Sequence, residues 1–224
     1  MVQNNNMFAA TVSEKTKSNV ISTIRSVLCA LLIFQLSAAC SEPEQEPVRI
    51  GILHSQSGTM ASSESALIDA ALLEVEELNA AGGVLGRPLE PVLADGRSDS
   101  DAFMAEAERL IVDEKVAAVF GTWTSEHRKA VKDVVEEHNA LLFYPLQYEG
   151  LEQSPNIVYL GPTPNQQIIP AVEWCHRFLG PRMFLVGSDY VFPRVANAIV
   201  KYELAEFGVD PVGARYVPPV SYTH

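Results

Sequence analysis

The chain has 224 residues, of which 47% are hydrophobic and 20% charged, a composition that excludes a disordered or fibrous protein and fits a globular one. It carries 16 Lys and Arg against 28 Asp and Glu, a net charge of −12, and an acidic surface repels nucleic acid and anionic lipid. Neither is therefore an expected partner.

The first 39 residues have the order of a secretory signal peptide. A polar, basic stretch leads into an apolar run over 27–34, and the small residues Ala38 and Ala39 follow just before Cys40. The run is too short for a membrane span, which takes roughly 20 apolar residues. Ala-Ala-Cys resembles the bacterial lipoprotein processing site, so Cys40 is the expected lipidation site. Ordinary cleavage, and an uncleaved anchor or spurious extension, remain open alternatives.

The next segment, residues 40–47, is acidic and contains Pro, which is typical of a solvated tether before a folded body. Apolar strand-like runs alternate with helical patterns from Val48 onward. This alternation predicts an α/β fold, in which helices connect the strands of parallel sheets.

Residues 48–162 are predicted to form a first lobe with five strands. Gly82 and Gly83 end its first helix, and Ser125 is the predicted N-cap of its third. Two roles for Ser125 stay open: capping alone, or capping together with contact to a ligand. The strands are expected near 48–53, 89–94, 116–120, 140–144 and 157–160, with a helix after each of the first three.

A second lobe is expected over 163–224, after the break at Pro162 to Pro164. It contains helices near 166–179 and from about 193 to Gly208, and strands near 183–186 and 214–217. Only two strands follow the break, so this lobe is predicted to be incomplete, and the 224-residue chain is predicted to be a fragment that binds ligand weakly.

The candidate ligand-binding residues follow the predicted strands, because the carboxyl ends of parallel strands meet at one edge of a sheet and ligands bind there. Hydroxyl, amide and aromatic side chains dominate these loops, which suits a small neutral polar ligand. The candidates are His54, Ser55, Ser57, Thr59, Trp123, Thr124, Ser125, Tyr144, Leu146, Gln147, Tyr148, Asp189, Tyr190 and Phe192.

The sequence contains few features typical of an enzyme. It has no GxSxG, HExxH, GxxxxGK or GxGxxG motif, and its five His residues lack the spacing of metal ligands. His54 and Ser55 are adjacent, so on an extended chain their side chains point to opposite faces. We therefore expect neither an enzyme nor a metal site nor a bound cofactor.

Five motifs in one order resemble the urea-binding component of urea ABC transporters, a branch of the type I periplasmic binding proteins. They are HSQSGTMA (54–61), LNAAGGVLGRPLEPV (78–92), FGTWTSEHRKAV (120–131), LLFYPLQYEGLEQSPNIVYLGPTPNQQ (141–167) and GSDYVFPR (187–194). The resemblance implies two Rossmann-like lobes whose cleft is lined by Trp123, Ser125, Tyr144, Leu146, Gln147, Tyr190 and Phe192.

The amide-sensing regulator of the aliphatic amidase operon shares much of this pattern, so an amide sensor, or a signalling ectodomain, is the alternative function. Leu146 and Gln147 favour urea, because the sensor has Thr and Pro at those places, and an export signal does not suit a cytoplasmic sensor. The resemblance thus implies a periplasmic or membrane-anchored protein that delivers urea or a short-chain amide to an ABC permease.

Overall fold

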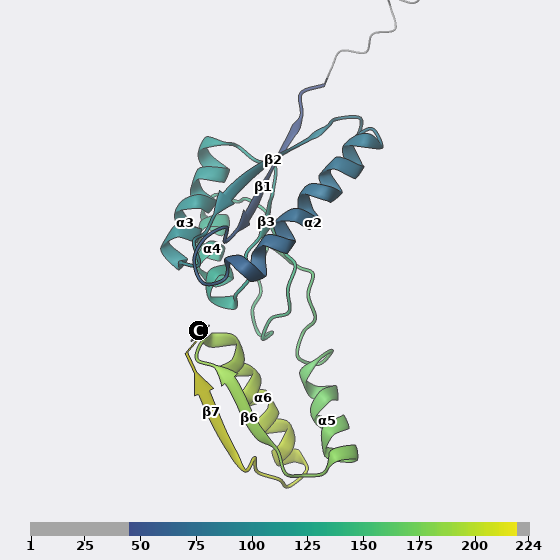
Figure 1. Ribbon diagram of the computed structural model, residues 1–224, viewed down its shortest axis with the longest axis vertical. Helices are drawn as coiled ribbons and strands as arrows, with labels where there is room; N and C mark the ends of the chain where they lie inside the picture. The colour runs from purple at the N-terminus through teal and green to yellow at the C-terminus, as the bar shows by residue number, and fades with distance from the viewer. Residues whose placement is uncertain (1–44, 219–224) are drawn as a thin grey trace, which may run out of the picture. The chain divides into compact units, whose positions relative to one another are not determined.

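The structure, a computed structural model, describes residues 45–218. The predicted signal peptide and the lipidation site Cys40 lie outside these residues. Within them the chain forms one five-stranded sheet of order β2-β1-β3-β4-β5 and one two-stranded sheet of order β6-β7, and all strand pairs are parallel (Figure 1). The α/β class with parallel sheets, predicted from the alternating pattern, is confirmed.

The first lobe alternates strands and helices along the chain. Its elements are β1 (Val48–His54), α2 (Ala61–Ala80), β2 (Leu89–Asp95), α3 (Ser100–Glu108), a π-helical turn η1 (Arg109–Asp113), β3 (Val119–Gly121), α4 (Ser125–Glu137), β4 (Leu142–Tyr144) and β5 (Ile157–Tyr159). Helix α2 covers one face of the sheet, and α3 and α4 cover the other (Figure 1).

The main core lies between the sheet and the pair α3 and α4. Leu53, Val119 and Leu142 each come from a different strand and are fully buried there. Successive residues of a strand point to opposite faces, so His54, the residue after Leu53, points to the α2 side. This alternation places apolar side chains under α3 and α4 and one polar side chain of β1 under α2.

Two predicted strands begin later than expected. The third was predicted from Val116 and the fourth from Ala140, but β3 begins at Val119 and β4 at Leu142. The Val116 amide donates to the Leu110 carbonyl, and the Ala140 amide donates to the Val135 carbonyl. Both amides therefore close the end of the preceding helix and are not available to a strand ladder.

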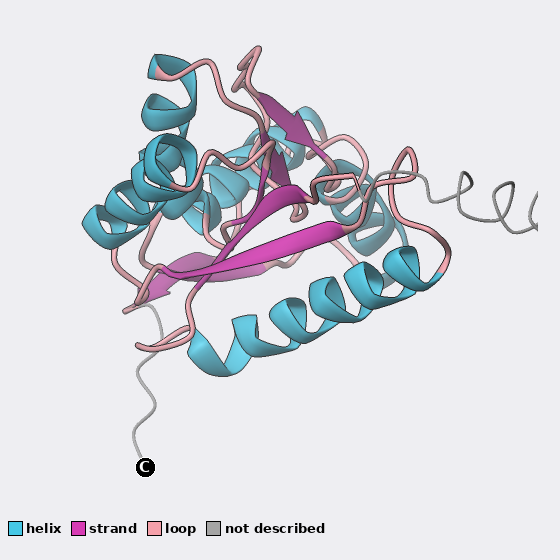
Figure 2. Ribbon diagram, turned by 90° about the horizontal axis from the view of Figure 1, so that it is seen from above, coloured by secondary structure: helices cyan, strands magenta, loops and turns pink. Residues whose placement is uncertain are grey.

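The second lobe contains α5 (Ile168–Leu179), β6 (Phe184–Ser188), α6 (Val191–Glu206) and β7 (Gly213–Val217). In the view from above, the five-stranded sheet of the first lobe has helices on both sides (Figure 2). Pro170 lies in the first turn of α5, where a missing backbone N–H costs no hydrogen bond. Among residues 45–218, no helix is both long and apolar enough to cross a membrane.

Candidate functional site

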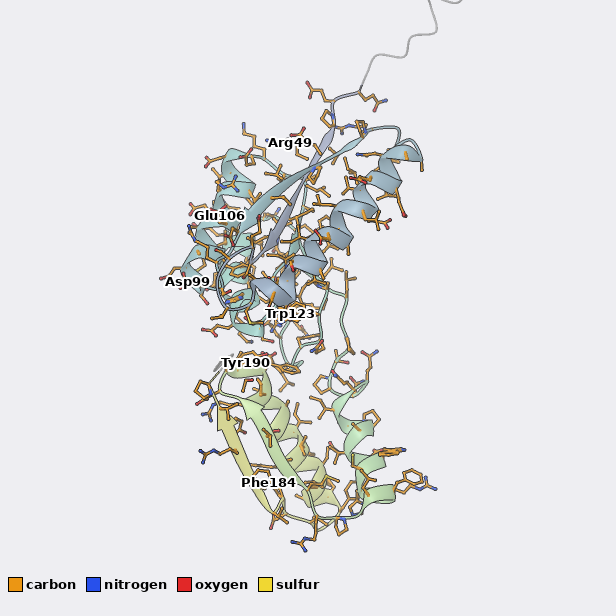
Figure 3. All side chains as sticks on the ribbon, in the orientation of Figure 1. Arg49, Asp99, Glu106, Trp123, Phe184 and Tyr190 are labelled. Atoms are coloured by element: carbon orange, nitrogen blue, oxygen red, sulfur yellow. The ribbon has the colours of Figure 1, made fainter. Side chains whose placement is uncertain are left out.

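The carboxyl edge of the five-stranded sheet gathers the candidates of the first lobe. β1 lies between β2 and β3, so the connections that leave β1 and β3 diverge, and such a divergence opens a crevice in parallel α/β sheets. The candidates around it follow β1, β3 and β4; Trp123, in the loop after β3, is labelled in Figure 3.

Ser57, in the loop after β1, is held by a carboxylate at the end of β2. Its Oγ donates to Asp95 Oδ2 over 2.7 Å, and its amide and that of Gln56 donate to Asp95 Oδ1 over 3.2 and 2.8 Å. Burial raises the pKa of Asp95, but the bonds from Ser57 and from the backbone outweigh it, so the pKa is lowered. The Ser57 hydroxyl is thus engaged within the protein.

His54 pairs with a buried glutamate that the candidate set omits. Its Nδ1 lies 3.0 Å from Oε2 of Glu64, and the Ser55 amide donates to the same oxygen over 2.9 Å. Glu64 is fully buried in the first turn of α2. The burial of Glu64 could have been predicted from the sequence, because Glu64 shares a helical face with Ile68 and Val75, at spacings of four and eleven residues.

The loop after β3 corrects one prediction, because Thr124 and not Ser125 is the N-cap of α4. Thr124 has extended backbone angles, and its Oγ1 accepts a hydrogen bond from the His127 amide over 3.1 Å. Ser125 is instead the first helical residue. Its Oγ donates to Glu149 Oε2 over 2.6 Å and accepts from Arg128 Nη1 over 3.0 Å, so its hydroxyl is bonded inside the protein.

Tyr144, at the end of β4, is buried, and its hydroxyl lies 3.0 Å from the Trp123 carbonyl oxygen and 3.1 Å from that of Gln147, both acceptors. It therefore ties the loop after β3 to the segment after β4. Gly161 packs against the same segment, because a Cβ at Gly161 would collide with the Leu146 carbonyl and the Gln147 amide.

A buried ionic cluster lies next to these loops, and the sequence analysis did not predict it. The Arg128 guanidinium, with no exposed side-chain surface, donates from Nε to Glu152 over 2.9 Å and from Nη2 to Glu149 over 3.3 Å. Lys129 Nζ donates to Glu152 over 2.6 Å, and the Tyr159 hydroxyl donates to the same residue over 2.8 Å. The partners are 7 to 24 residues apart, so no local pattern reveals them.

The charges of this cluster are mutually compensated. Burial raises the pKa of Glu152, but the hydrogen bonds from Arg128, Lys129 and Tyr159 outweigh it and lower the pKa to about 2. Burial likewise opposes ionisation of Glu149, whose pKa is lowered by Ser125 and Arg128. Both carboxylates are therefore ionised at neutral pH and neutralised by the two cations.

A pocket of 520 Å³ lies beside the segment after β4, within the size range of small-molecule sites. Of the candidates, Tyr148 lines it, and its ring stacks on Tyr159 with centroids 4.5 Å apart. Glu149, Glu152 and Thr163 are among its other lining residues. Among residues 45–218, no group of three His, Cys, Asp or Glu side chains is placed to hold a metal ion.

The candidates of the second lobe follow β6. Asp189 accepts a hydrogen bond from Arg194 Nε over 2.6 Å, and the Arg194 guanidinium lies over the Tyr216 ring at 4.5 Å. Tyr190, labelled in Figure 3, is the N-cap residue of α6, and Phe192 lies in its first turn. These three candidates thus lie at the carboxyl edge of the second sheet.

Comparison with known proteins agrees with this architecture. The family described as "Periplasmic binding protein domain" matches residues 48–222. The "Leu/Ile/Val-binding protein homolog 7" of Brucella suis biovar 1 is 35% identical over 189 residues, which cover 82% of this chain and 45% of the relative. Its counterpart in Brucella abortus (strain 2308) is 34% identical over 206 residues, 85% of this chain and 50% of the relative. The chain spans about half the length of these relatives.

Solved structures of the same fold include solute-binding proteins. One from Rhodopseudomonas palustris BisB5, in complex with 3,4-dihydroxybenzoic acid, has a TM-score of 0.68 at 22% identity and covers 77% of this chain and 47% of its own. The Streptococcus pneumoniae protein LivJ, in complex with isoleucine, has a TM-score of 0.66 at 20% identity and covers 77% and 50%. The chain therefore belongs to the periplasmic binding protein family, with the type I fold.

Proposed function

We propose that this protein captures urea or a short-chain amide outside the cytoplasm and delivers it to an ABC permease. The observation that carries the proposal is that three of the five motifs, those containing Ser57, Trp123 to Ser125 and Tyr144 to Tyr148, follow β1, β3 and β4 and so meet at one edge of a parallel sheet. In this role the protein binds and releases its ligand unchanged and is not an enzyme.

The chemistry of the crevice suits a small, neutral molecule rich in N–H groups. Urea has four N–H hydrogens and one carbonyl oxygen, so its site needs several acceptors and a few donors. The Gln147 carboxamide supplies an acceptor, and the first turn of α4 presents backbone N–H donors for the carbonyl oxygen. Because the Ser125 hydroxyl is bonded to Glu149 and Arg128, we expect Ser125 to contribute through its backbone.

A second candidate ligand is a branched-chain amino acid, favoured by the names of the Brucella relatives at 34–35% identity. The charged ammonium and carboxylate of such a ligand need separate partners, whereas the acidic and basic groups of the first-lobe cluster neutralise one another. This self-compensation is the reason to prefer a neutral ligand.

Isothermal titration calorimetry of the intact gene product with urea, acetamide and leucine tests the proposal. We expect saturable binding of urea, weakened by Gln147→Ala and unaffected by Gln167→Ala, an exposed residue with the same side chain. Binding of leucine without any response to urea or acetamide would replace the proposed ligand. Permease and ATPase genes beside this gene would favour transport over the alternative of an amide sensor.

A further inference from the structure

The side chain of Arg128 makes several contacts with one segment of the chain, residues 144–159. It lies in the first turns of α4 and is fully buried, and its guanidinium donates four hydrogen bonds, two to Glu152, one to Glu149 and one to Ser125. The fork geometry of arginine matches carboxylates, so this pairing fixes direction as well as distance.

Three aromatic rings surround the same guanidinium. Its central carbon lies 4.7 Å from the ring centroid of Tyr144, 5.3 Å from that of Tyr148 and 5.9 Å from that of Tyr159. These distances fall within the range of cation–π attraction, which is strongest where water is excluded. Every ring and both carboxylates belong to residues 144–159, so one side chain of α4 contacts this segment at five places.

The part of this segment that connects β4 and β5 has little backbone structure of its own. Between Pro145 and Pro155, all of which the structure describes, one backbone–backbone hydrogen bond is formed, from the Tyr148 amide to the Pro162 carbonyl oxygen over 3.4 Å. A segment held by so few backbone bonds depends on side chains for its order. Leu146, Gln147 and Tyr148 lie in it.

We propose that Arg128 is a positioning residue that holds residues 145–155, the connection between β4 and β5, in their ligand-ready arrangement before any ligand arrives. Arg128 acts through Glu149, Glu152 and the three tyrosine rings. Lys129, which is partly exposed, pairs with the same two glutamates. Preordering of this segment lowers the cost of ligand binding, because the chain does not have to be fixed during the event. The effect on affinity rests on the proposed function, whereas the ordering of the segment does not.

Hydrogen–deuterium exchange of the ligand-free chain tests the ordering. In R128Q, we expect amide exchange over 144–160 to rise at least about tenfold while α2 and β1 keep their wild-type rates. R128K retains the charge and part of the pairing, so it should recover at least part of the lost protection. R109Q is the matched control, since Arg109 also pairs with two glutamates, Glu106 and Glu114, but from a half-exposed position in η1.

The same experiment can overturn the inference. A rise of equal size in every peptide would show that Arg128 acts only on global stability, and no rise over 144–160 would show that the segment orders itself. If R128Q does not fold, E152Q, which keeps the side-chain shape, should raise exchange in the same peptides more than in α2 and β1. Where urea binds the wild type, R128Q should weaken its affinity by about tenfold and R109Q should not; absence of urea binding in all variants would refute the proposed ligand and leave the exchange result standing.

Discussion

Single polar residues decide much of how the first lobe is held together. Glu64, Arg128 and Glu149 are almost without solvent exposure, and each has a charged or hydrogen-bonding partner on another element. Breaking one member of such a pair costs more than the pair contributes, because the remaining charge stays buried without compensation. The residues of this kind are therefore where substitutions have their clearest effects.

Acid should weaken the protein through Glu152. Its pKa falls from 4.5 in the unfolded chain to about 2 in the folded one, so its contribution is present above pH 4.5 and is lost as the pH falls toward 2. The shift corresponds to about 3 kcal/mol at neutral pH. In E152Q, thermal denaturation followed by circular dichroism should give lower stability at pH 7 and a flatter decline between pH 5 and 2. E137Q, at an exposed position of α4, should keep the wild-type profile.

The cap of α4 makes a second prediction at this scale. Thr124→Ala removes the oxygen that accepts from the His127 amide, and loss of an N-cap costs about 1 kcal/mol. Thr124→Ser keeps that oxygen and should stay within about 0.5 kcal/mol of the wild type in thermal denaturation. Equal stability of T124A and wild type would mean that the helix start is satisfied by other groups.

Helices and strands of the first lobe are joined by a core that lies mainly on one face of the sheet. Phe103, Ala107 and Leu110 from the α3–η1 segment and Val131 and Val135 from α4 are all fully buried. Leu110 packs so closely on β1 that a Cβ at Gly51 would lie 2.9 Å from its Cδ1. The π-helical turn therefore packs its leucine directly against β1, an interior strand of the sheet.

Truncation of Leu110 tests this packing. Leu110→Ala removes a fully buried side chain, and such changes cost about 2 to 5 kcal/mol, depending on how far the cavity collapses. Leu73→Ala makes the same chemical change at a position that is 56% exposed on α2 and should cost less than about 1 kcal/mol. Chemical denaturation of the two variants measures the difference; similar losses would mean that the core does not centre on η1.

The whole chain divides its apolar burial unequally between its two sheets. The largest core cluster consists of residues between Leu53 and Ile157, all in the first lobe. Among residues 163–218 the buried hydrophobic residues are Val172, Leu185 and Leu204, whereas Trp174, Phe178 and Val186 are more than half exposed. Apolar burial is the main favourable term in folding, so we expect the first lobe to be the more stable of the two when each is expressed alone.

Separate expression of the two lobes tests that claim. We expect residues 45–162 to fold alone with a cooperative thermal transition, since roughly 110 residues suffice for a domain. Residues 163–218 should lack such a transition and should bind a hydrophobic dye. Cooperative folding of the second fragment would show that its three buried residues are enough, and failure of the first would show that it needs the second lobe.

Local pattern was sufficient to predict the order of strands and helices. Apolar runs with period two or 3.6 depend on residues a few positions apart, so the α/β class and the end of the last helix at Gly208 could be predicted in advance. The motifs that follow the strands indicated the family in the same way, and the family match over residues 48–222 agrees.

Tertiary structure alone decided how the polar side chains are used. Ser125 bonds to Glu149, 24 residues away, and Arg128 bonds to Glu152 at the same separation, so no local window contains both partners. Thr124 rather than Ser125 became the cap because the backbone turns helical one residue after it, a choice that two neighbouring hydroxyl residues leave open in sequence. Periodicity shows which face of a helix is buried, but a buried charge is stable only where the fold brings a distant partner to it.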